Sequence, residues 1–205
     1  MKQLIMKVLN IAVQLIAVAT IAGIIWYGFN FITNTNILLA NVNGASMNYT
    51  LLDKEQVIIK PQEQYERGDI IAFYGNLEDP LNTALQDASG NIQETRYVKR
   101  IVAVGGDTVE GKKDGLYING EKANEPYLAN EQTTFPIEWN IQNLAKGEYW
   151  ADDKNATVVP EGEYFVLGDN REVSDDSRYF GFINPSSILG KVYQLKWNQN
   201  KTLEN

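Results

Sequence analysis

The sequence predicts a mainly β protein, with an antiparallel β-sheet or small barrel as its core, an inserted smaller lobe, and one N-terminal transmembrane helix. An apolar segment covers residues 8–32. Beyond it, short runs of β-branched and aromatic residues alternate with turn residues, which is typical of antiparallel strands. Two long polar stretches interrupt this pattern. In a chain of 205 residues, these observations favour one anchor and one globular domain.

The segment 8–32 is long enough to span the roughly 30 Å hydrocarbon layer of a bilayer as a helix. Trp26 and Tyr27 stand where an interfacial aromatic belt is expected. A cleaved secretory signal is the competing interpretation, because Ala-Val-Ala at 17–19 has the small-x-small form of a cleavage site. Since the apolar segment continues past this site, we expect an uncleaved, single-pass anchor.

Charge predicts the orientation of the anchor. Lys2 and Lys7 precede it, and the first acidic residue is Asp53, so the positive-inside rule places residues 1–7 in the cytoplasm and residues 33–205 outside the cell membrane. The whole chain has 18 basic and 26 acidic side chains. The part outside is therefore acidic, which argues against nucleic acid as a partner.

Six strands are predicted after the anchor. Asn119 and Gly120 follow a Leu-Tyr-Ile run and form a strong signal for a two-residue hairpin turn. The predicted strands cover residues 56–60, 69–74, 96–104, 116–118, 163–167 and 191–196.

Two stretches do not fit this strand pattern. Residues 75–94 are rich in Asn, Asp, Ser and Gly, and we expect an extended hairpin or a mobile loop there. Residues 121–162 are long, acidic and aromatic, and we expect them to form the inserted lobe. Five aromatic residues are expected to give this lobe its own packing: Tyr127, Phe135, Trp139, Tyr149 and Trp150.

The composition excludes several kinds of catalysis. There is no histidine, so a Ser-His-Asp triad and imidazole-rich zinc sites are impossible. There is no cysteine, which removes thiol catalysis, disulfides and thiolate metal sites. The remaining hydrolytic possibilities are Ser or Thr with Lys, paired carboxylates, or an all-oxygen metal site.

The first candidate for chemistry is the segment GASMNYTLL at residues 44–52, in which Ser46 follows two small residues shortly after the anchor. A serine hydroxyl becomes a strong nucleophile when a neighbouring base takes its proton. A serine in this setting is more commonly a capping or turn hydroxyl, so a catalytic role requires a partner.

The second candidate is Lys99, which interrupts the β-branched run RYVKRIVAVGGD at residues 96–107. Because side chains alternate along a strand, Lys99 points toward whatever Ile101 packs against. An isolated lysine of this kind commonly snorkels from an edge strand. Burial would instead disfavour the ammonium, lower the lysine pKa from about 10.4 and make the amine a base for a serine hydroxyl.

The third candidate is PEGEYFVLGDNREVSDDSRYFGF at residues 160–182, a predicted strand followed by a dense polar segment. A charged surface loop is its simplest interpretation. However, Ser174, Asp176 and Arg178 alternate, so an extended backbone would place all three on one side. There, a hydroxyl could hold the lysine amine, and a carboxylate could pair with the arginine.

These three segments, in this order behind an anchor, resemble the boxes of the type I signal peptidase family, and RGDIIAF at residues 67–73 matches a fourth. The similarity covers nearly the whole chain, from the anchor to about Gly190, and the lack of cysteine together with Gly44 favours the Gram-positive type. The resemblance implies a membrane-bound serine endopeptidase with Ser46 as nucleophile and Lys99 as general base. It further implies that Ser174 orients the lysine amine.

The resemblance also implies supporting roles for other residues. Met47 is expected to help shape the site. Five charged residues are expected to form a polar network that supports the site without reacting: Arg100, Asp169, Arg171, Asp176 and Arg178.

The sequence departs from the family pattern at several positions. Gly44 stands where some members have a serine whose hydroxyl stabilises the oxyanion, so backbone N–H groups, including that of Ser46, are expected to serve instead. Tyr49 replaces a usual proline. Ala103 and Gly105 replace a glycine and a proline after the lysine strand, which affects turn geometry more than chemistry.

The implied substrates are secretory preproteins with small-x-small cleavage sites, because shallow apolar pockets accept alanine-sized side chains. The anchor holds Ser46 near the lipid bilayer, where a signal helix presents its cleavage site. The substrate backbone is expected to add as a strand beside an exposed edge. No metal or organic cofactor is implied, and the oligomeric state is left open.

Three other interpretations remain. A signal-peptidase-like assembly factor for surface proteins or pili, with little or no proteolysis, is the main one. The departures described above and the aromatic, acidic insertion favour it, whereas the presence of both Ser46 and Lys99 counts against it. A Ser-Lys self-cleaving repressor would have a DNA-binding module in place of the anchor. A plain β-rich surface domain would make the three segments coincidental.

Overall fold

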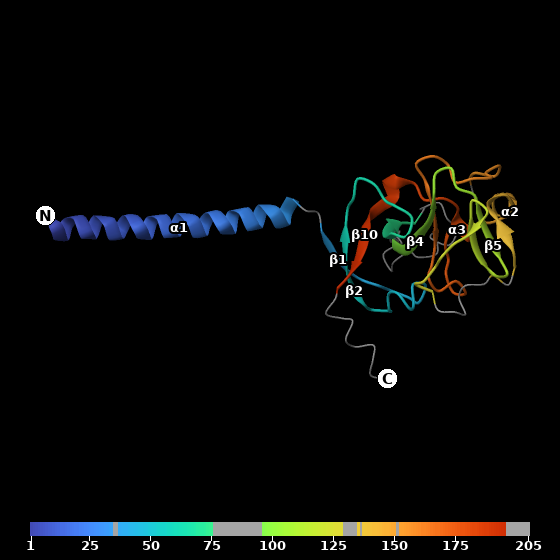
Figure 1. The fold of residues 1–205 in the computed structure, drawn as a ribbon, viewed down its shortest axis with the longest axis horizontal. Coiled ribbons are helices and arrows are strands. Elements are labelled where there is room, and N and C mark those ends of the chain that lie inside the picture. Colours follow the sequence, from blue (N-terminus) through green and yellow to red (C-terminus); the bar gives the residue numbers. More distant parts are fainter. Residues whose placement is uncertain (35–36, 76–95, 129–134, 136, 151, 196–205) are drawn as a thin grey trace, which may run out of the picture. The chain divides into compact units, whose positions relative to one another are not determined.

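The computed structural model divides the chain into two compact units, Met1–Ile37 and Leu38–Asn205, each of which is described by itself (Figure 1). The structure describes residues 1–34, 37–75, 96–128, 135, 137–150 and 152–195.

The first unit consists mainly of helix α1, Lys2–Asn34. Its part Leu9–Gly28 is long and apolar enough to cross a membrane. The Thr20 hydroxyl donates to the carbonyl of Ala17 at 2.8 Å, so this polar side chain keeps a hydrogen-bond partner within the helix. The helix is longer than the predicted segment 8–32, because hydropathy marks only the part suited to lipid, whereas backbone hydrogen bonding continues into the flanking residues.

The second unit contains a six-stranded antiparallel sheet with the order β1-β2-β10-β3-β4-β9. Among the described residues, the last strand, β10, therefore lies between β2 and β3, and β1 and β9 form the edges. The six strands are β1 Leu38–Asn41, β2 Gln56–Lys60, β3 Ile70–Tyr74, β4 Arg96–Val104, β9 Tyr164–Leu167 and β10 Ile188–Gln194.

A four-stranded antiparallel sheet has the order β7-β6-β5-β8. Asn119 and Gly120 connect β6 to β7 with φ values of 54° and 79°, as a type I′ hairpin turn requires. A Cβ on Gly111 would overlap the Trp139 ring, so only glycine lets β8 lie beside β5. The elements are β5 Val109–Lys112, β6 Gly115–Ile118, β7 Glu121–Lys122, β8 Trp139–Asn140 and helix α2 Ile141–Lys146.

The two sheets share one of the three hydrophobic clusters found among the described residues. Phe135 and Trp150 pack in the same buried cluster as Val102 of β4 and Phe165 of β9. The predicted lobe at 121–162 therefore does not have a core of its own, and its sheet also uses β5 and β6, which precede residue 121. Of the five aromatic residues predicted to pack it, Tyr149 is 72% exposed.

The strand predictions agree well with the larger sheet. The strands predicted at 56–60 and 96–104 have the observed bounds. The last strand begins at Ile188 rather than 191 and ends at Gln194. Four strands were not predicted, β1, β5, β7 and β8, because they are short and poor in β-branched residues. Residues 76–95 lie outside the described residues, so the hairpin or loop expected there stays a prediction.

Two short helical turns follow β9. Helix α3 covers Ser177–Phe180, with Asp176 as its N-cap, and the 3-10 helix η2 covers Pro185–Ser187. The extended backbone predicted through Ser174, Asp176 and Arg178 is therefore wrong beyond Asp176. The reason is local, since the Asp176 carboxylate accepts from the Arg178 N–H and caps a helical turn.

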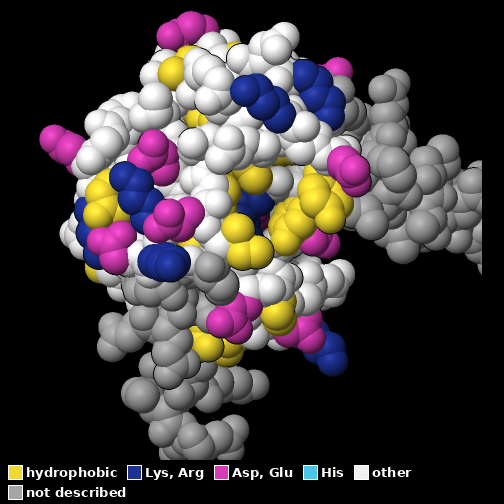
Figure 2. Space-filling model, turned by 90° about the vertical axis from the view of Figure 1, so that its right-hand side faces the viewer, with side chains coloured by type: hydrophobic (Ala, Val, Ile, Leu, Met, Phe, Trp, Pro, Cys, Tyr) yellow, Lys and Arg dark blue, Asp and Glu magenta, His cyan; other side chains and the backbone are white. Residues whose placement is uncertain are grey.

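The described surface carries charges of both signs. On the face in Figure 2, acidic side chains are interspersed with Lys and Arg, and hydrophobic side chains gather around a hollow. No broad basic area is visible among the described residues of that face.

Candidate active site

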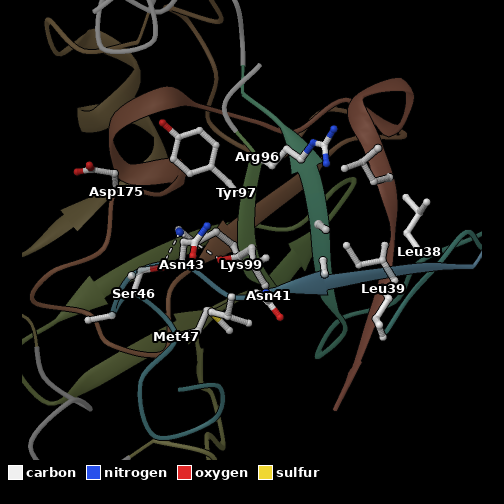
Figure 3. A pocket seen from close by; sticks show the side chains of 18 of the residues that line it. Leu38, Leu39, Asn41, Asn43, Ser46, Met47, Arg96, Tyr97, Lys99 and Asp175 are labelled. Carbon is white, nitrogen blue, oxygen red and sulfur yellow. Dashed lines mark hydrogen bonds between the residues drawn. The ribbon is translucent and has the colours of Figure 1, made fainter. Parts of the chain in front are cut away.

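An open pocket of about 1270 Å³ lies over the larger sheet. Strand β1 and the loop after it form one side, β3, β4 and β10 contribute further lining, and Val173 and Asp175 reach it from the segment after β9. Ser46 and Lys99 both line this pocket (Figure 3). The candidate segments that contain Ser46 and Lys99 thus meet in this pocket, and the third candidate segment also lines it.

Ser46 and Lys99 are in direct contact. Lys99 Nζ donates to Ser46 Oγ at 2.9 Å and to the Val98 carbonyl at 3.2 Å (Figure 3). The pairing of β3 with β4 places Lys99 opposite Ile71, in the middle of the sheet, which leaves the lysine only 3% exposed. This lysine does not snorkel to solvent.

Burial changes the chemistry of the amine. It lowers the pKa of Lys99 from 10.5 to about 8, although Asp176 and Asp175 oppose the shift by favouring the ammonium. A pKa near 8 leaves part of the amine neutral at neutral pH. The amine can then accept the proton of the Ser46 hydroxyl along the same contact.

The Ser46 loop is fixed at several points. Gly44 has a φ of +95°, which favours glycine, and its N–H donates to Asp53 Oδ1 at 2.8 Å. On the other side, the Asn170 N–H donates to the Ser46 carbonyl at 2.9 Å. Met47 is 1% exposed and packs in the cluster beneath the loop. Loop and core together hold the serine hydroxyl toward the pocket.

The backbone conformation of Tyr49 bears on the replacement of a usual proline at this position. Its φ is +80°, a region that proline, fixed near −65°, cannot adopt. A proline could therefore not occupy position 49 in this backbone conformation.

Ser174 is brought to the site without the predicted contact. It is 4% exposed, and its hydroxyl oxygen has no hydrogen-bond partner among the described residues, so no bond to Lys99 is present. A Cβ on Gly168 would overlap Ser174 Oγ and lie 2.5 Å from the Ser46 carbonyl oxygen. Gly168 is therefore the residue that allows the third segment to pack directly behind the Ser46 loop.

Asp176 and Arg178 form the pair that the alternation suggested. Arg178 Nε donates to Asp176 Oδ1 at 2.7 Å, and its Nη2 donates to the carbonyl of Arg171 at 2.8 Å. Asp176 is fully buried and also accepts from the Gly168 N–H at 3.0 Å. This pair connects the end of β9 to the turns that follow it.

Arg100 and Asp169 form a second buried pair behind the sheet. Arg100 donates to both carboxylate oxygens of Asp169, at 2.8 and 2.6 Å, and to the Gly68 carbonyl at 2.8 Å. The Thr50 hydroxyl donates to Asp169 at 2.5 Å. Through Thr50, the pair is linked to the segment that carries Ser46.

Several residues of this arrangement were missed by the sequence reasoning. Thr50 lies inside the first segment and Asp53 directly follows it, and Gly168 and Asn170 lie inside the third, so their positions were the available signals. Glu125 and Tyr127 contact Arg171 and Arg100, respectively, from a remote part of the chain. No local pattern indicates those contacts. Among the described residues, no group of three or more acidic side chains is placed to hold a metal ion.

Comparisons with known proteins show the family to which this chain belongs. The family described as signal peptidase, peptidase S26, matches residues 9–197, and the chain belongs to this family. Signal peptidase IB of Staphylococcus aureus is 36% identical over 165 residues, which are 76% of this chain and 75% of the relative. Signal peptidase I of Bacillus licheniformis is 36% identical over 154 residues, 73% and 70% of the two chains.

A solved structure of a signal peptidase I from Enterococcus faecalis is 36% identical and superposes with a TM-score of 0.47, covering 64% of this chain and 98% of that one. With the family established by sequence, the chain is an enzyme of the signal peptidase class, a membrane-bound peptidase that removes signal peptides.

Proposed function

We propose that this enzyme cleaves secretory preproteins with a Ser–Lys dyad, in which Ser46 is the nucleophile and Lys99 the general base. The observation that carries the proposal is the 2.9 Å contact between Lys99 Nζ and Ser46 Oγ inside a pocket. The lysine is buried and its pKa is lowered to about 8. A base of suitable pKa within hydrogen-bond reach of a hydroxyl is what general-base catalysis requires.

The reaction begins with a neutral amine. Lys99 Nζ accepts the proton of the Ser46 hydroxyl while Oγ attacks the scissile carbonyl carbon, whose oxygen becomes an oxyanion. When the carbonyl re-forms, the C–N bond breaks and the Lys99 ammonium gives its proton to the departing amine. A water molecule then attacks the acyl ester carbon while the Lys99 amine takes its proton. The C–Oγ bond breaks as the ammonium returns the proton to Ser46 Oγ, which releases the acid product.

The oxyanion requires a hydrogen-bond donor. The N–H of Ser46 has no hydrogen-bond partner among the described residues and serves this role, whereas the N–H of Gly44 is already bonded to Asp53. Because Gly44 brings no hydroxyl, the stabilisation relies on backbone donors.

The remaining predicted residues have supporting roles. The unpaired, buried Ser174 hydroxyl is available to receive the Lys99 amine when a substrate displaces the present contact. The pairs Arg100–Asp169 and Arg178–Asp176 hold the segments that surround the dyad and do not react. Removing one partner would leave a buried charge unpaired and distort the site.

The substrate binds as an extended strand. Among the described strands, β1 is an edge of the sheet and lines the pocket, so a substrate backbone can pair beside it. Ala40, Ile59 and Val98 give the pocket an apolar lining suited to small side chains on either side of a variable one. These features support preproteins with small-x-small sites as the substrates.

The anchor orients the enzyme in the lipid bilayer. Lys2 and Lys7 lie at the start of α1, and the segment Leu9–Gly28 suits the membrane interior. The positive-inside rule then places the N-terminus in the cytoplasm and the second unit on the extracytoplasmic side, where preproteins emerge.

The test uses full-length protein in detergent and lipid with a preprotein containing an Ala-x-Ala site. Product masses are compared for the wild type, Ser46→Ala and Lys99→Ala. Ser186→Ala and Lys122→Ala are matched controls, because both residues lie outside the pocket. Cleavage after the second alanine, lost in both dyad variants and kept in both controls, supports the proposal.

The same experiment judges the alternative of an assembly factor for surface proteins or pili. Folded wild type that cleaves none of several preproteins, and a Ser46→Ala variant that retains the biological function, would favour that alternative. Cleavage that persists in Ser46→Ala would show that a different residue is the nucleophile.

A further inference from the structure

A buried ion pair between two residues that do not line the pocket has no part in the steps above. The side chains of Glu125 and Arg171 are 5% and 2% exposed. Both Glu125 carboxylate oxygens accept from the Arg171 guanidinium. The Tyr127 hydroxyl donates to the same carboxylate at 2.8 Å. Glu125 comes from the segment after β7, whereas Arg171 follows β9, so the pair joins two remote parts of the chain.

Arg171 is part of the turn that touches the nucleophile. Its Nε donates to the Gly168 carbonyl at 3.0 Å, which fixes the turn formed by residues 168–171. Within that turn, Asn170 donates its backbone N–H to the Ser46 carbonyl at 2.9 Å and its side-chain amide to the Ala45 carbonyl at 3.1 Å. Three contacts therefore lead from Glu125 to the backbone of Ser46.

A second path starts two residues further along the same segment. The guanidinium of Arg100 lies over the Tyr127 ring, 3.8 Å from its centre. Arg100 is bonded to Asp169, and Asp169 accepts from the Thr50 hydroxyl, four residues after Ser46. Both paths pass through the turn 168–171, and both end at the segment that carries the nucleophile.

We propose that Glu125 is a positioning residue, which acts through Arg171 and the turn 168–171 to hold Ser46 at its distance from Lys99. This inference rests on the proposed role of Ser46 as nucleophile. Without the carboxylate, Arg171 would keep a buried charge with no counter-ion, and the turn would rearrange to satisfy it. Because a misplacement of about 1 Å can cost about a hundredfold in rate, a small shift of the turn is sufficient to impair catalysis.

The test measures kcat and KM with a preprotein for full-length Glu125→Gln and Glu125→Asp, together with the wild type and Ser46→Ala. Glu110→Gln is the matched control, because Glu110 pairs with Lys112 on the exposed surface of the smaller sheet. Rates are expressed per folded protein, from thermal unfolding of each sample. The pH dependence of kcat is recorded for each variant.

We expect Glu125→Gln to lower kcat at least tenfold with KM within twofold of the wild type, since neither Glu125 nor Arg171 lines the substrate pocket. Glu125→Asp keeps the charge and should recover part of kcat. The pH midpoint of kcat should not move, because Glu125 is not among the causes of the Lys99 pKa shift. Those causes are the burial of the amine and the charges of Asp176, Asp175 and Arg178. Glu110→Gln should behave as the wild type.

A kcat for Glu125→Gln within twofold of the wild type, or an effect on KM alone, overturns the inference. A lower melting temperature with unchanged kcat per folded protein overturns it as well, because the pair would then be merely structural. Should Glu125→Gln not fold, Glu125→Asp is judged by the same criteria. If only Ser46→Ala loses cleavage and Glu125→Gln does not, the inference fails but the proposed function stands. If cleavage persists in Ser46→Ala, both the proposed function and the inference fail.

Discussion

Lys99 links the burial of one amine to the pH range in which the enzyme works. Its pKa is lowered to about 8, so the ammonium predominates below that pH and the neutral base above it. Catalysis therefore should fall about tenfold for each pH unit below about 8, and should level off above it. The measurement is kcat between pH 6 and 10. A flat profile through pH 8 would contradict Lys99 as the base.

Asp175 should adjust that midpoint. This exposed carboxylate lines the pocket and favours the ammonium form of Lys99 (Figure 3). Replacing it by Asn removes a negative charge, so the Lys99 pKa should fall further and the acidic limb of the kcat profile should move to lower pH. Glu110→Asn, remote from the pocket, should leave the limb in place. A shift of the limb to higher pH would show that Asp175 acts by another means.

The backbone conformation of Tyr49 predicts that a substitution by glycine at this position increases the stability of the fold. Its φ of +80° is costly for a residue with a side chain, and the side chain is 61% exposed, so little packing is lost on its removal. Tyr49→Gly should therefore stabilise the fold by about 0.5 to 1 kcal/mol. Tyr193→Gly, in extended strand β10, should destabilise it. Denaturant unfolding decides, and a loss of stability in Tyr49→Gly equal to that of Tyr193→Gly would refute the argument.

At the scale of the element, the junction between β9 and the turn 168–171 leaves no room for a side chain. Gly168→Ala would force its Cβ against Ser174 Oγ and the Ser46 carbonyl, so we expect a loss of about 1 to 3 kcal/mol in stability and of at least a hundredfold in kcat. Gly28→Ala in α1 meets no atom within 4 Å and is the control. Wild-type activity in Gly168→Ala would mean that the turn and the Ser46 loop can separate freely.

The elements that could be predicted from the sequence are those with local signals. The run of β-branched residues around Lys99 indicated β4, and Asn119 with Gly120 indicated the hairpin turn. The Ser46, Lys99 and Ser174 segments could be brought together only by the resemblance to a family, because nothing local in the chain sets distances between them. Strand β1 was missed because its pairing with β2, rather than its own residues, makes it a strand.

The rest of the site depends on tertiary contacts. Glu125 is followed by a proline in an acidic stretch and has the local appearance of a loop residue. Only the fold places it against Arg171. The helical turn α3 was likewise hidden, because the sequence is compatible both with Asp176 capping a helix and with an extended chain in which Asp176 pairs with Arg178. In the structure Asp176 caps the helical turn and also pairs with Arg178.

At the scale of the whole molecule, the shared core predicts one cooperative unfolding event for the two sheets. Val102 and Phe165 of the larger sheet are buried in the same cluster as Leu116 of β6 and Trp150. Peptides from β6 and from β9 should therefore lose hydrogen-exchange protection at the same denaturant concentration. Earlier exposure of β6 would show that the smaller sheet unfolds as a separate unit.

The same shared core limits how signal peptidases of this kind can be recombined. A lobe with its own core could be exchanged between relatives as a module, through its two connections alone. Here the exchanged segment would have to match Phe165 and Leu167 of β9, which form part of its packing surface. It would also have to bring a partner for Arg171. Chimeras that transplant residues 121–162 alone should therefore be poor enzymes, whereas those that include β5, β6 and β9 keep the inherited fit.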